Sequence, residues 1–284
     1  MGLGIRSPGV SGRTGRNLTV AVAVGLSLGG LVLATLLTVK ATFLALAGAA
    51  EGLALWELDR ALRSRQIRLP VIPIVIGGAA MIAGEYWAGD HATLAALVIT
   101  VIAILAWRLP GGAGGYVRDV TAGAFALAYL PLMAVFIAAM LAPPDGAYRV
   151  LVFVILTVCS DVGGYFAGIS FGRHPMAPVI SPKKTWEGLA GSVIACLAAG
   201  GIGVPYLLGG RPWQGIIAGA AAVAAATLGD LAESMIKRDL KIKDMSSVLP
   251  GHGGILDRID SLLVTAPVMW LVLASLVPVR LCRP

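Results

Sequence analysis

Charged side chains are scarce in this sequence. Asp, Glu, Lys and Arg make up only 13% of the 284 residues, while 57% are apolar. An average soluble domain carries about twice that share of charge. The mean hydropathy of +0.86 shows the same deficit. The composition therefore excludes an ordinary soluble domain and predicts a protein that resides in a lipid bilayer.

Cysteine is also rare, and each of the three residues lies in or beside an apolar run. Their spacing matches neither a disulfide framework nor a zinc site. We interpret them as small side chains that pack within the membrane. They are Cys159, Cys196 and Cys282.

A continuous basic segment is absent too, although the net charge is +7. Lys and Arg lie in short connectors between apolar runs, which is the pattern of membrane topology. We therefore expect no nucleic-acid partner.

Long apolar runs are abundant. A helix needs about 20 apolar residues to cross a bilayer, and nine runs come close to this length. They cover residues 18–38, 41–58, 70–86, 91–107, 119–142, 148–170, 188–209, 213–236 and 261–280. The first run follows three arginines as in a secretory signal, but it is longer than the apolar core of such a signal. We expect an uncleaved first helix and an all-α polytopic integral membrane protein with about nine transmembrane helices.

The basic residues test this count of spans. If the N-terminus is cytoplasmic, 17 of the 22 Lys and Arg residues lie inside, and the five outside are Lys40, Arg149, Arg211, Arg280 and Arg283. This distribution follows the positive-inside rule and predicts an external C-terminus. We expect one membrane domain, 1–284, in the cell (plasma or inner) membrane. Residues 1–150 would hold spans one to five, and residues 151–284 the catalytic helices and cytoplasmic loops.

Acidic residues inside the spans need a reason, because a carboxylate at the bilayer centre costs roughly 2.5 to 3.5 kcal/mol. Glu57 can pair with Arg60 or reach the interface, and Glu51 has no explanation beyond packing. The candidates are Glu51, Glu57, Asp161, Asp230 and Glu233.

Four polar residues of the eighth span, Asp230, Glu233, Ser234 and Lys237, share one helix face. They form either a functional stripe toward the cytoplasm or, more simply, a satisfied Glu233–Lys237 ion pair. In the sixth span, Asp161 lies among glycines about 14 Å from the cytoplasmic end.

The connector before the seventh span contains Ser181-Pro182, which is typical of a helix start. Lys183 and Lys184 follow directly. Two lysines at a helix N-terminus favour an anion site suited to phosphate, and a solvated cytoplasmic charge pair is the alternative. We assign no role to the nearby His174.

The segment 234–260 places several basic residues before a glycine-rich turn, and Asp257 and Asp260 follow one helical turn apart. Glycines let backbone N–H groups approach phosphate closely. The two aspartates, facing Asp230 on the neighbouring helix, form an all-oxygen set suited to Mg²⁺. These features at the inner membrane face indicate phosphoryl or nucleotidyl transfer onto a lipid.

The same segment resembles the signature of the phosphatidate cytidylyltransferase (CDP-diacylglycerol synthase) family. Asp161 and its glycines resemble the DxGAY element of this family, and SPKKTWEG resembles its SPKKTxEG element. The chain departs from the pattern at Gly164, where Ala is usual, and at Met245-Ser246, where Phe-Gly is common. The matched signature positions are Ser234, Lys237, Arg238, Lys243, Asp244, His252, Gly253, Gly254, Asp257, Arg258 and Asp260.

The resemblance implies transfer of CMP from CTP to phosphatidate with Mg²⁺, a monovalent cation such as K⁺, and a homodimer in contact with membrane lipids. It implies metal ligation by Asp230 and Asp257, with Asp161 and Asp260 as weaker candidates. The expected catalytic residues are Asp230, Asp257, Lys237, Arg238, His252 and Asp260. The expected substrate-binding residues are Ser181, Lys183, Lys184, Thr185, Glu187, Ser234, Lys243, Asp244, Gly253, Gly254, Arg258 and Asp161.

Two other functions fit part of the pattern. An ion-coupled transporter would explain the buried acids but not the cytoplasmic loop rich in Lys, Gly and Asp. A CDP-alcohol phosphotransferase would need its DG, AR, G and paired-D helix pattern, which the sequence does not contain.

Overall fold

The structure is a computed structural model that describes residues 18–248 and 253–279. Eight of its helical segments are long and apolar enough to cross a membrane. A further helix, α1 (Leu18–Thr38), corresponds to the first predicted span and contains the apolar stretch Gly25–Thr38. The prediction of an all-α, multi-pass membrane protein with about nine spans is confirmed.

The helix boundaries lie close to the predicted spans, and one small hairpin interrupts the helical pattern. Before the hairpin the helices are α2 (Lys40–Arg63), α3 (Val71–Ala88), α4 (Asp90–Arg108), α5 (Tyr116–Tyr129), α6 (Pro131–Leu141) and α7 (Gly146–Phe171). The hairpin consists of β1 (Pro175–Ala177) and β2 (Ser181–Thr185). After it come α8 (Trp186–Gly203), a π-helical turn (Val204–Leu208), α9 (Pro212–Leu240) and α10 (Leu256–Leu276).

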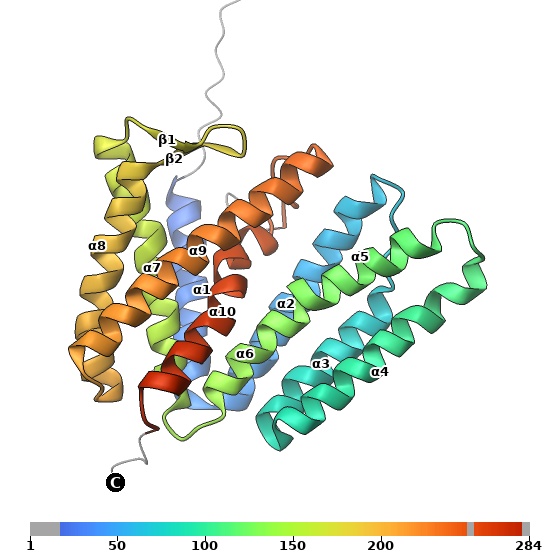
Figure 1. Cartoon of the computed structure of the whole chain (residues 1–284), viewed down its shortest axis with the longest axis horizontal. Coiled ribbons are helices and arrows are strands. Elements are labelled where there is room, and N and C mark those ends of the chain that lie inside the picture. The colour runs from blue at the N-terminus through green and yellow to red at the C-terminus, as the bar shows by residue number, and fades with distance from the viewer. Residues whose placement is uncertain (1–17, 249–252, 280–284) are drawn as a thin grey trace, which may run out of the picture.

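Successive spans run in alternating directions (Figure 1). The ends of α2, α7 and α9 lie on the same side as the hairpin. The turns that join α1 to α2, α3 to α4 and α8 to α9 lie on the opposite side. The described parts of the two longest connectors, after α7 and after α9, are thus on one side, as the nine-span pattern predicts.

The predicted fifth span, 119–142, is one membrane segment built from two helices, α5 and α6. Leu130 separates them with φ −105° and ψ −77°. The break follows from Pro131, because a proline has no N–H to donate and its ring disfavours helical geometry at the preceding residue.

Glycines bring α7, α8 and α9 into very close contact. A Cβ atom at Gly191 of α8 would lie only 2.6 Å from the carbonyl oxygen of Gly163 in α7. A Cβ atom at Gly215 of α9 would lie 1.9 Å from the carbonyl oxygen of Gly200 in α8. Small residues at such crossings let helix backbones approach each other within a membrane. The polar residues on these three helices are therefore held near one another.

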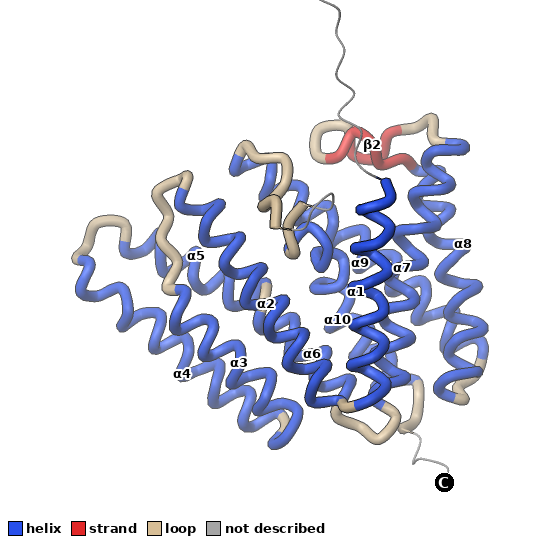
Figure 2. The backbone as a smooth tube through the Cα atoms, turned by 180° about the vertical axis from the view of Figure 1, so that it is seen from behind, coloured by secondary structure: helices blue, strands red, loops and turns tan. Residues whose placement is uncertain are grey.

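The helix α10 connects the two halves of the molecule. It packs against α7 and α9 on one side and against α2 and α6 on the other. At its end, the buried guanidinium of Arg149 donates to the carbonyl oxygens of Leu273 at 3.1 Å and Val277 at 2.9 Å. Seen from behind, α1 lies in front of α7 and α10, and it packs against α2 and α7 (Figure 2).

Candidate functional site

A polar cavity of about 450 Å³ lies among α7, the hairpin, α8, α9, the segment after α9, and the start of α10. It gathers most of the charged residues that the sequence analysis singled out. Ser181 and Thr185 also line it, together with small residues of α7 and α8. Its charged lining residues are Asp161, Lys183, Lys184, Asp230, Lys237, Asp244, Asp257, Arg258 and Asp260.

Asp230 forms an ion pair across the cavity with Lys184. The Lys184 Nζ atom lies 2.7 Å from Oδ2 of Asp230, and the Ser234 hydroxyl lies 3.4 Å from Oδ1. The pair joins β2 to the middle of α9. Because Asp230 keeps 37% of its side-chain surface exposed, it remains accessible from the cavity.

Lys237 is the centre of a second charged cluster. Its Nζ atom pairs with Glu233, one helical turn earlier and fully buried, and lies 2.9 Å from Oδ1 of Asp257. The predicted Glu233–Lys237 ion pair is therefore present, and Lys237 extends it across to Asp257 of α10. Glu233 received no site role from the sequence, although its place on the stripe was a visible signal.

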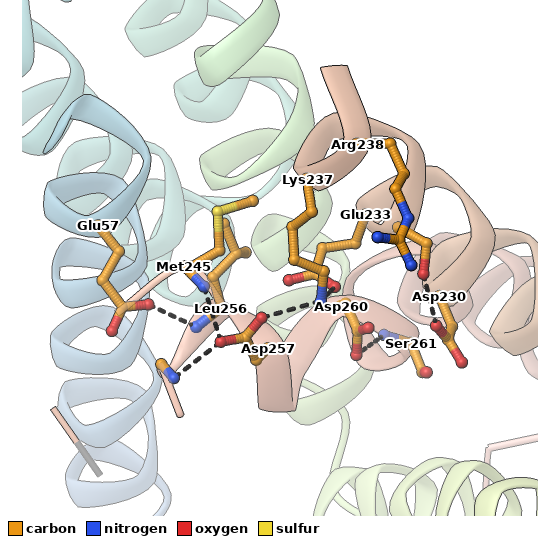
Figure 3. Close-up of polar contacts among 12 residues, drawn as sticks. Glu57, Asp230, Glu233, Lys237, Arg238, Met245, Leu256, Asp257, Asp260 and Ser261 are labelled. Atoms are coloured by element: carbon orange, nitrogen blue, oxygen red, sulfur yellow. Dashed lines mark hydrogen bonds and ion pairs between the residues drawn. The ribbon is translucent and has the colours of Figure 1, made fainter. Parts of the chain in front are cut away.

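Asp257 has both carboxylate oxygens engaged (Figure 3). Oδ1 binds Lys237, while Oδ2 accepts the N–H of Met245 at 3.0 Å and the N–H of Gly254 at 2.8 Å. These bonds fix Asp257 at the first turn of α10. The Gly254 N–H, which the sequence analysis offered to a phosphate, is donated to Asp257 in this structure.

Glu57 corrects an expectation from the sequence. It is completely buried, and in the described part of the chain it forms no ion pair with Arg60. Its carboxylate accepts hydrogen bonds from the hydroxyl of Ser246 and from the first backbone N–H groups of α10. No pattern within α2 could reveal these partners, since they lie about 190 to 200 positions later in the chain.

Asp161 and Asp260 complete the acidic lining of the cavity. Asp260 is 8% exposed, and its Oδ1 accepts the N–H of Ser261 at 2.7 Å. A Cβ atom at Gly229 of α9 would lie 2.7 Å from the carbonyl oxygen of Asp260, so α9 and α10 approach closely beside Asp230. The predicted proximity of Asp230 to the start of α10 is thus present.

The hairpin β1–β2 was not expected, and it replaces the predicted helix start at Ser181-Pro182. The helix α8 begins five residues after Ser181, with Thr185 as its N-cap; the Thr185 hydroxyl accepts the N–H of Gly188 at 3.1 Å. Lys183 and Lys184 therefore lie on a strand, both line the cavity, and the Lys184 side chain reaches Asp230 across it.

Glu187, predicted to bind substrate, and Arg238, predicted to be catalytic, have structural partners instead. Glu187 accepts the N–H groups of Arg173 at 3.1 Å and His174 at 3.2 Å, and its carboxylate lies 2.5 Å from Nδ1 of His174. Glu187 therefore holds the start of the hairpin and does not line the cavity, and His174 takes part in that contact. Arg238 donates to the carbonyl oxygen of Ile180 at 3.2 Å, which fastens the hairpin to α9.

Of the remaining signature residues, Asp244 and Gly253 lie at the same site. Lys243 and Asp244 follow α9, and Asp244 reaches the cavity wall. Gly253 has φ +87°, a conformation that favours glycine. Its Cβ position would lie 3.0 Å from Oδ2 of Asp257. His252 lies outside the described residues.

The cavity supplies hard oxygen donors of the type that Mg²⁺ prefers. Within residues 18–248 and 253–279, no three His, Cys, Asp or Glu side chains are grouped closely enough to hold a metal ion by themselves. The donor chemistry fits Mg²⁺ only if substrate phosphates and water supply most of its ligands, which is how this ion commonly binds.

Fold and cavity together define a polytopic helical membrane protein with a charged pocket at one end of its helices. Residues 19–276 match the family model described as the Cytidylyltransferase family, and the chain belongs to this family. The predicted resemblance and the class of nucleotidyltransferase are confirmed.

Relatives of known name agree. The chain is 41% identical over 277 residues to a phosphatidate cytidylyltransferase of Mycobacterium bovis, covering 93% of this chain and 90% of the relative. It is 41% identical over 280 residues to the protein of that name from Mycobacterium leprae, with the same two shares. The enzyme of that name from Haemophilus influenzae is 45% identical over 130 residues, which is 44% of this chain and 45% of the relative. These matches give no support to the transporter alternative.

Proposed function

We propose that this protein transfers CMP from CTP to phosphatidate, forming CDP-diacylglycerol and pyrophosphate for phospholipid synthesis. Its membership of the cytidylyltransferase family supports the nucleotidyl donor, and its relatives support the lipid acceptor. The observation that carries the mechanism is the cavity in which five basic and acidic side chains from β2, α9 and α10 meet: Lys183, Lys184, Asp230, Lys237 and Asp257.

The chemistry requires alignment and charge neutralisation more than proton transfer. A phosphate oxygen of phosphatidate attacks the α-phosphorus of CTP and forms a new P–O bond. The bond between the α-phosphorus and the oxygen that bridges it to the β-phosphorus breaks. Pyrophosphate leaves with the electron pair of that bond. The attacking phosphate is already ionised near neutral pH, so no dedicated general base is needed.

The basic residues have the charge and placement to bind the phosphates. Lys183 and Lys184 extend from the hairpin, and Lys237 and Arg258 from α9 and α10, toward one cavity. Positive charge at these positions would stabilise the negative charge of the pyrophosphate leaving group. Arg238 acts here by holding the hairpin, through Ile180, over the end of α9.

We further propose Mg²⁺ as the cofactor, held by Asp230 and Asp257 with help from Asp161 or Asp260, and a monovalent cation such as K⁺ nearby. Bound Mg²⁺ would supply Lewis-acid charge at the reacting phosphates. Asp230 of α9 and Asp257 of α10 would present their carboxylate oxygens to the cavity that the phosphates enter. We also propose that the cavity and the N-terminus face the cytoplasm and that the enzyme is a homodimer.

The test is pyrophosphate release by the purified chain in detergent, with CTP, phosphatidate and Mg²⁺ omitted in turn. Release should require all three. Asp257→Asn should lower kcat on the order of 10²-fold or more, since it removes the charge that Lys237 and two N–H donors face. A matched control is Asp239→Asn, an exposed acid near the end of α9, which should leave release unchanged. A folded preparation without lipid-dependent release would contradict the proposed function.

A further inference from the structure

Glu57, near the end of α2, makes contacts that connect the first half of the chain to the catalytic half. Its Oε1 accepts the Ser246 hydroxyl at 2.5 Å and the Ile255 N–H at 2.9 Å. Its Oε2 accepts the Leu256 N–H at 2.8 Å. One buried side chain thus binds both sides of the segment that leads from α9 into α10.

These bonds satisfy the start of α10. The first N–H groups of a helix have no partner within the helix and carry partial positive charge. Glu57 supplies a carboxylate to two of them from another helix, about 200 positions away in sequence. Burying this charge is favourable only because several donors meet it.

The contacts lie directly beside Asp257. The N–H groups of residues 254, 255 and 256 point in order to Asp257, Glu57 and Glu57. On the other side of the segment, the Met245 N–H binds Asp257 and the Ser246 hydroxyl binds Glu57. The two carboxylates are therefore bound by adjacent donors of the same two short stretches, 245–246 and 254–256 (Figure 3). The position of one carboxylate thus constrains the other.

Gly254 fits this arrangement sterically. A Cβ atom at this position would lie 2.6 Å from Oε2 of Glu57, closer than real contacts allow. The carboxylate cannot easily move away, because three donors hold it. The absence of a side chain at Gly254 therefore makes room for Glu57.

We propose that Glu57 is a positioning residue for Asp257, and through it for Lys237, in the reaction proposed above. It is not catalytic, because it is fully buried and does not line the cavity. Its part is to fix the start of α10 so that Asp257 faces Lys237 with both oxygens engaged. This inference rests on the proposed function for its kinetic test only.

The test compares Glu57→Gln with Glu51→Gln. Both residues are buried acids of α2, but Glu51 lies near Gly78 and Pro131, and among the described residues no hydrogen bond joins it to α10. In Glu57→Gln an amide N–H₂ group faces a backbone donor. We expect kcat to fall about 10- to 100-fold with the KM for CTP changed less than threefold, because misplacement affects the transition state most. Glu57→Asp should recover part of the loss, and Glu51→Gln should match wild type.

Hydrogen exchange followed by mass spectrometry gives a readout independent of turnover. The peptide that contains residues 253–257 should exchange faster in Glu57→Gln, while peptides from α7 and α8 stay as in wild type. If wild type shows no turnover, the proposed function fails, and the exchange result still tests Glu57. Wild-type kinetics and exchange in Glu57→Gln would overturn the positioning role.

A second variant keeps the test decisive if Glu57→Gln does not fold. Ser246→Ala removes one donor and leaves the two N–H bonds to Glu57. It should lower kcat two- to fivefold and speed exchange of the same peptide. Unchanged kcat and exchange in Ser246→Ala and in Glu57→Asp would refute the proposal.

Discussion

At the scale of single residues, the site is organised by lysines that neutralise acids. Lys184 pairs with Asp230, and Lys237 pairs with Asp257 and Glu233. Each ammonium group carries the positive charge that can bind a phosphate, and each forms an ion pair with a carboxylate in this structure. Lys237, which we propose to bind phosphate, is therefore also structural, because Glu233 beside it is fully buried.

Replacing Lys237 should therefore affect stability as well as turnover. Lys237→Met leaves Glu233 and Asp257 without their cation, and breaking such a buried pair costs about 3–5 kcal/mol. We expect a clear fall in Tm in detergent and loss of pyrophosphate release. Glu233→Gln added to Lys237→Met should restore most of the Tm and none of the activity, because it removes the charge of Glu233, while Asp257 keeps its two N–H donors.

The matched control for this pair of variants is Lys241→Met. Lys241 is exposed just after the last turn of α9. The Tm of Lys241→Met should equal that of wild type. If Lys237→Met were equally stable, the ion pairs around Lys237 would contribute nothing to the fold.

At the scale of elements, the position of the hairpin depends on how closely α7 and α8 approach. The strand β2 leads directly into α8, and Asp161 of α7 lines the same cavity as Lys183 and Lys184 of β2. The close approach of α7 and α8 at their glycines therefore affects the distance between Asp161 and these lysines.

A methyl group at the crossing should disturb both the packing and the site. In Gly191→Ala the new Cβ would lie 2.3 Å from Cβ of Ala167 and 2.6 Å from the carbonyl oxygen of Gly163. Such overpacking typically costs about 1–3 kcal/mol. We expect a lower Tm and a reduced kcat, measured on the same detergent preparation.

The same substitution elsewhere on α8 serves as the comparison. In Gly201→Ala the nearest neighbour of the new Cβ would be Ile216 at 3.6 Å, an ordinary contact. Alanine is also favoured over glycine in a helix by up to about 1 kcal/mol. Gly201→Ala should be as stable as wild type or more so. A Gly191→Ala variant as stable as Gly201→Ala would show that the helices adjust freely.

At the scale of the whole molecule, local patterns determined which parts of the structure were predictable. Apolar length predicts the spans, and the signature predicts the cluster around Asp230 and Asp257, because both depend on short stretches of sequence. Pro131 is a signal for a helix break, but the apolar run around it made residues 119–142 look like one continuous helix. The hairpin and the contact of Glu57 with Leu256 depend on tertiary packing between distant segments, which neither periodicity nor spacing records.

The sidedness of the molecule is a prediction from the sequence that an experiment can test directly. The structure places the hairpin and the start of α4 on opposite sides of the helices (Figure 1). The positive-inside rule assigns the hairpin side to the cytoplasm. In a variant whose native cysteines are replaced, we would introduce Val179→Cys, where the side chain is 88% exposed, or His91→Cys, at the exposed start of α4.

A membrane-impermeant maleimide should label His91→Cys in intact cells with a permeable outer layer, and Val179→Cys only after the inner membrane is opened. Both variants must retain pyrophosphate release, so that labelling reports the active fold. Cytoplasmic labelling of Val179→Cys would place the cavity on the side where CTP is made, within reach of phosphatidate in the inner leaflet. The reversed pattern would place Lys183 and Lys184 outside, where no CTP is available, and would contradict both the orientation and the proposed route of the nucleotide.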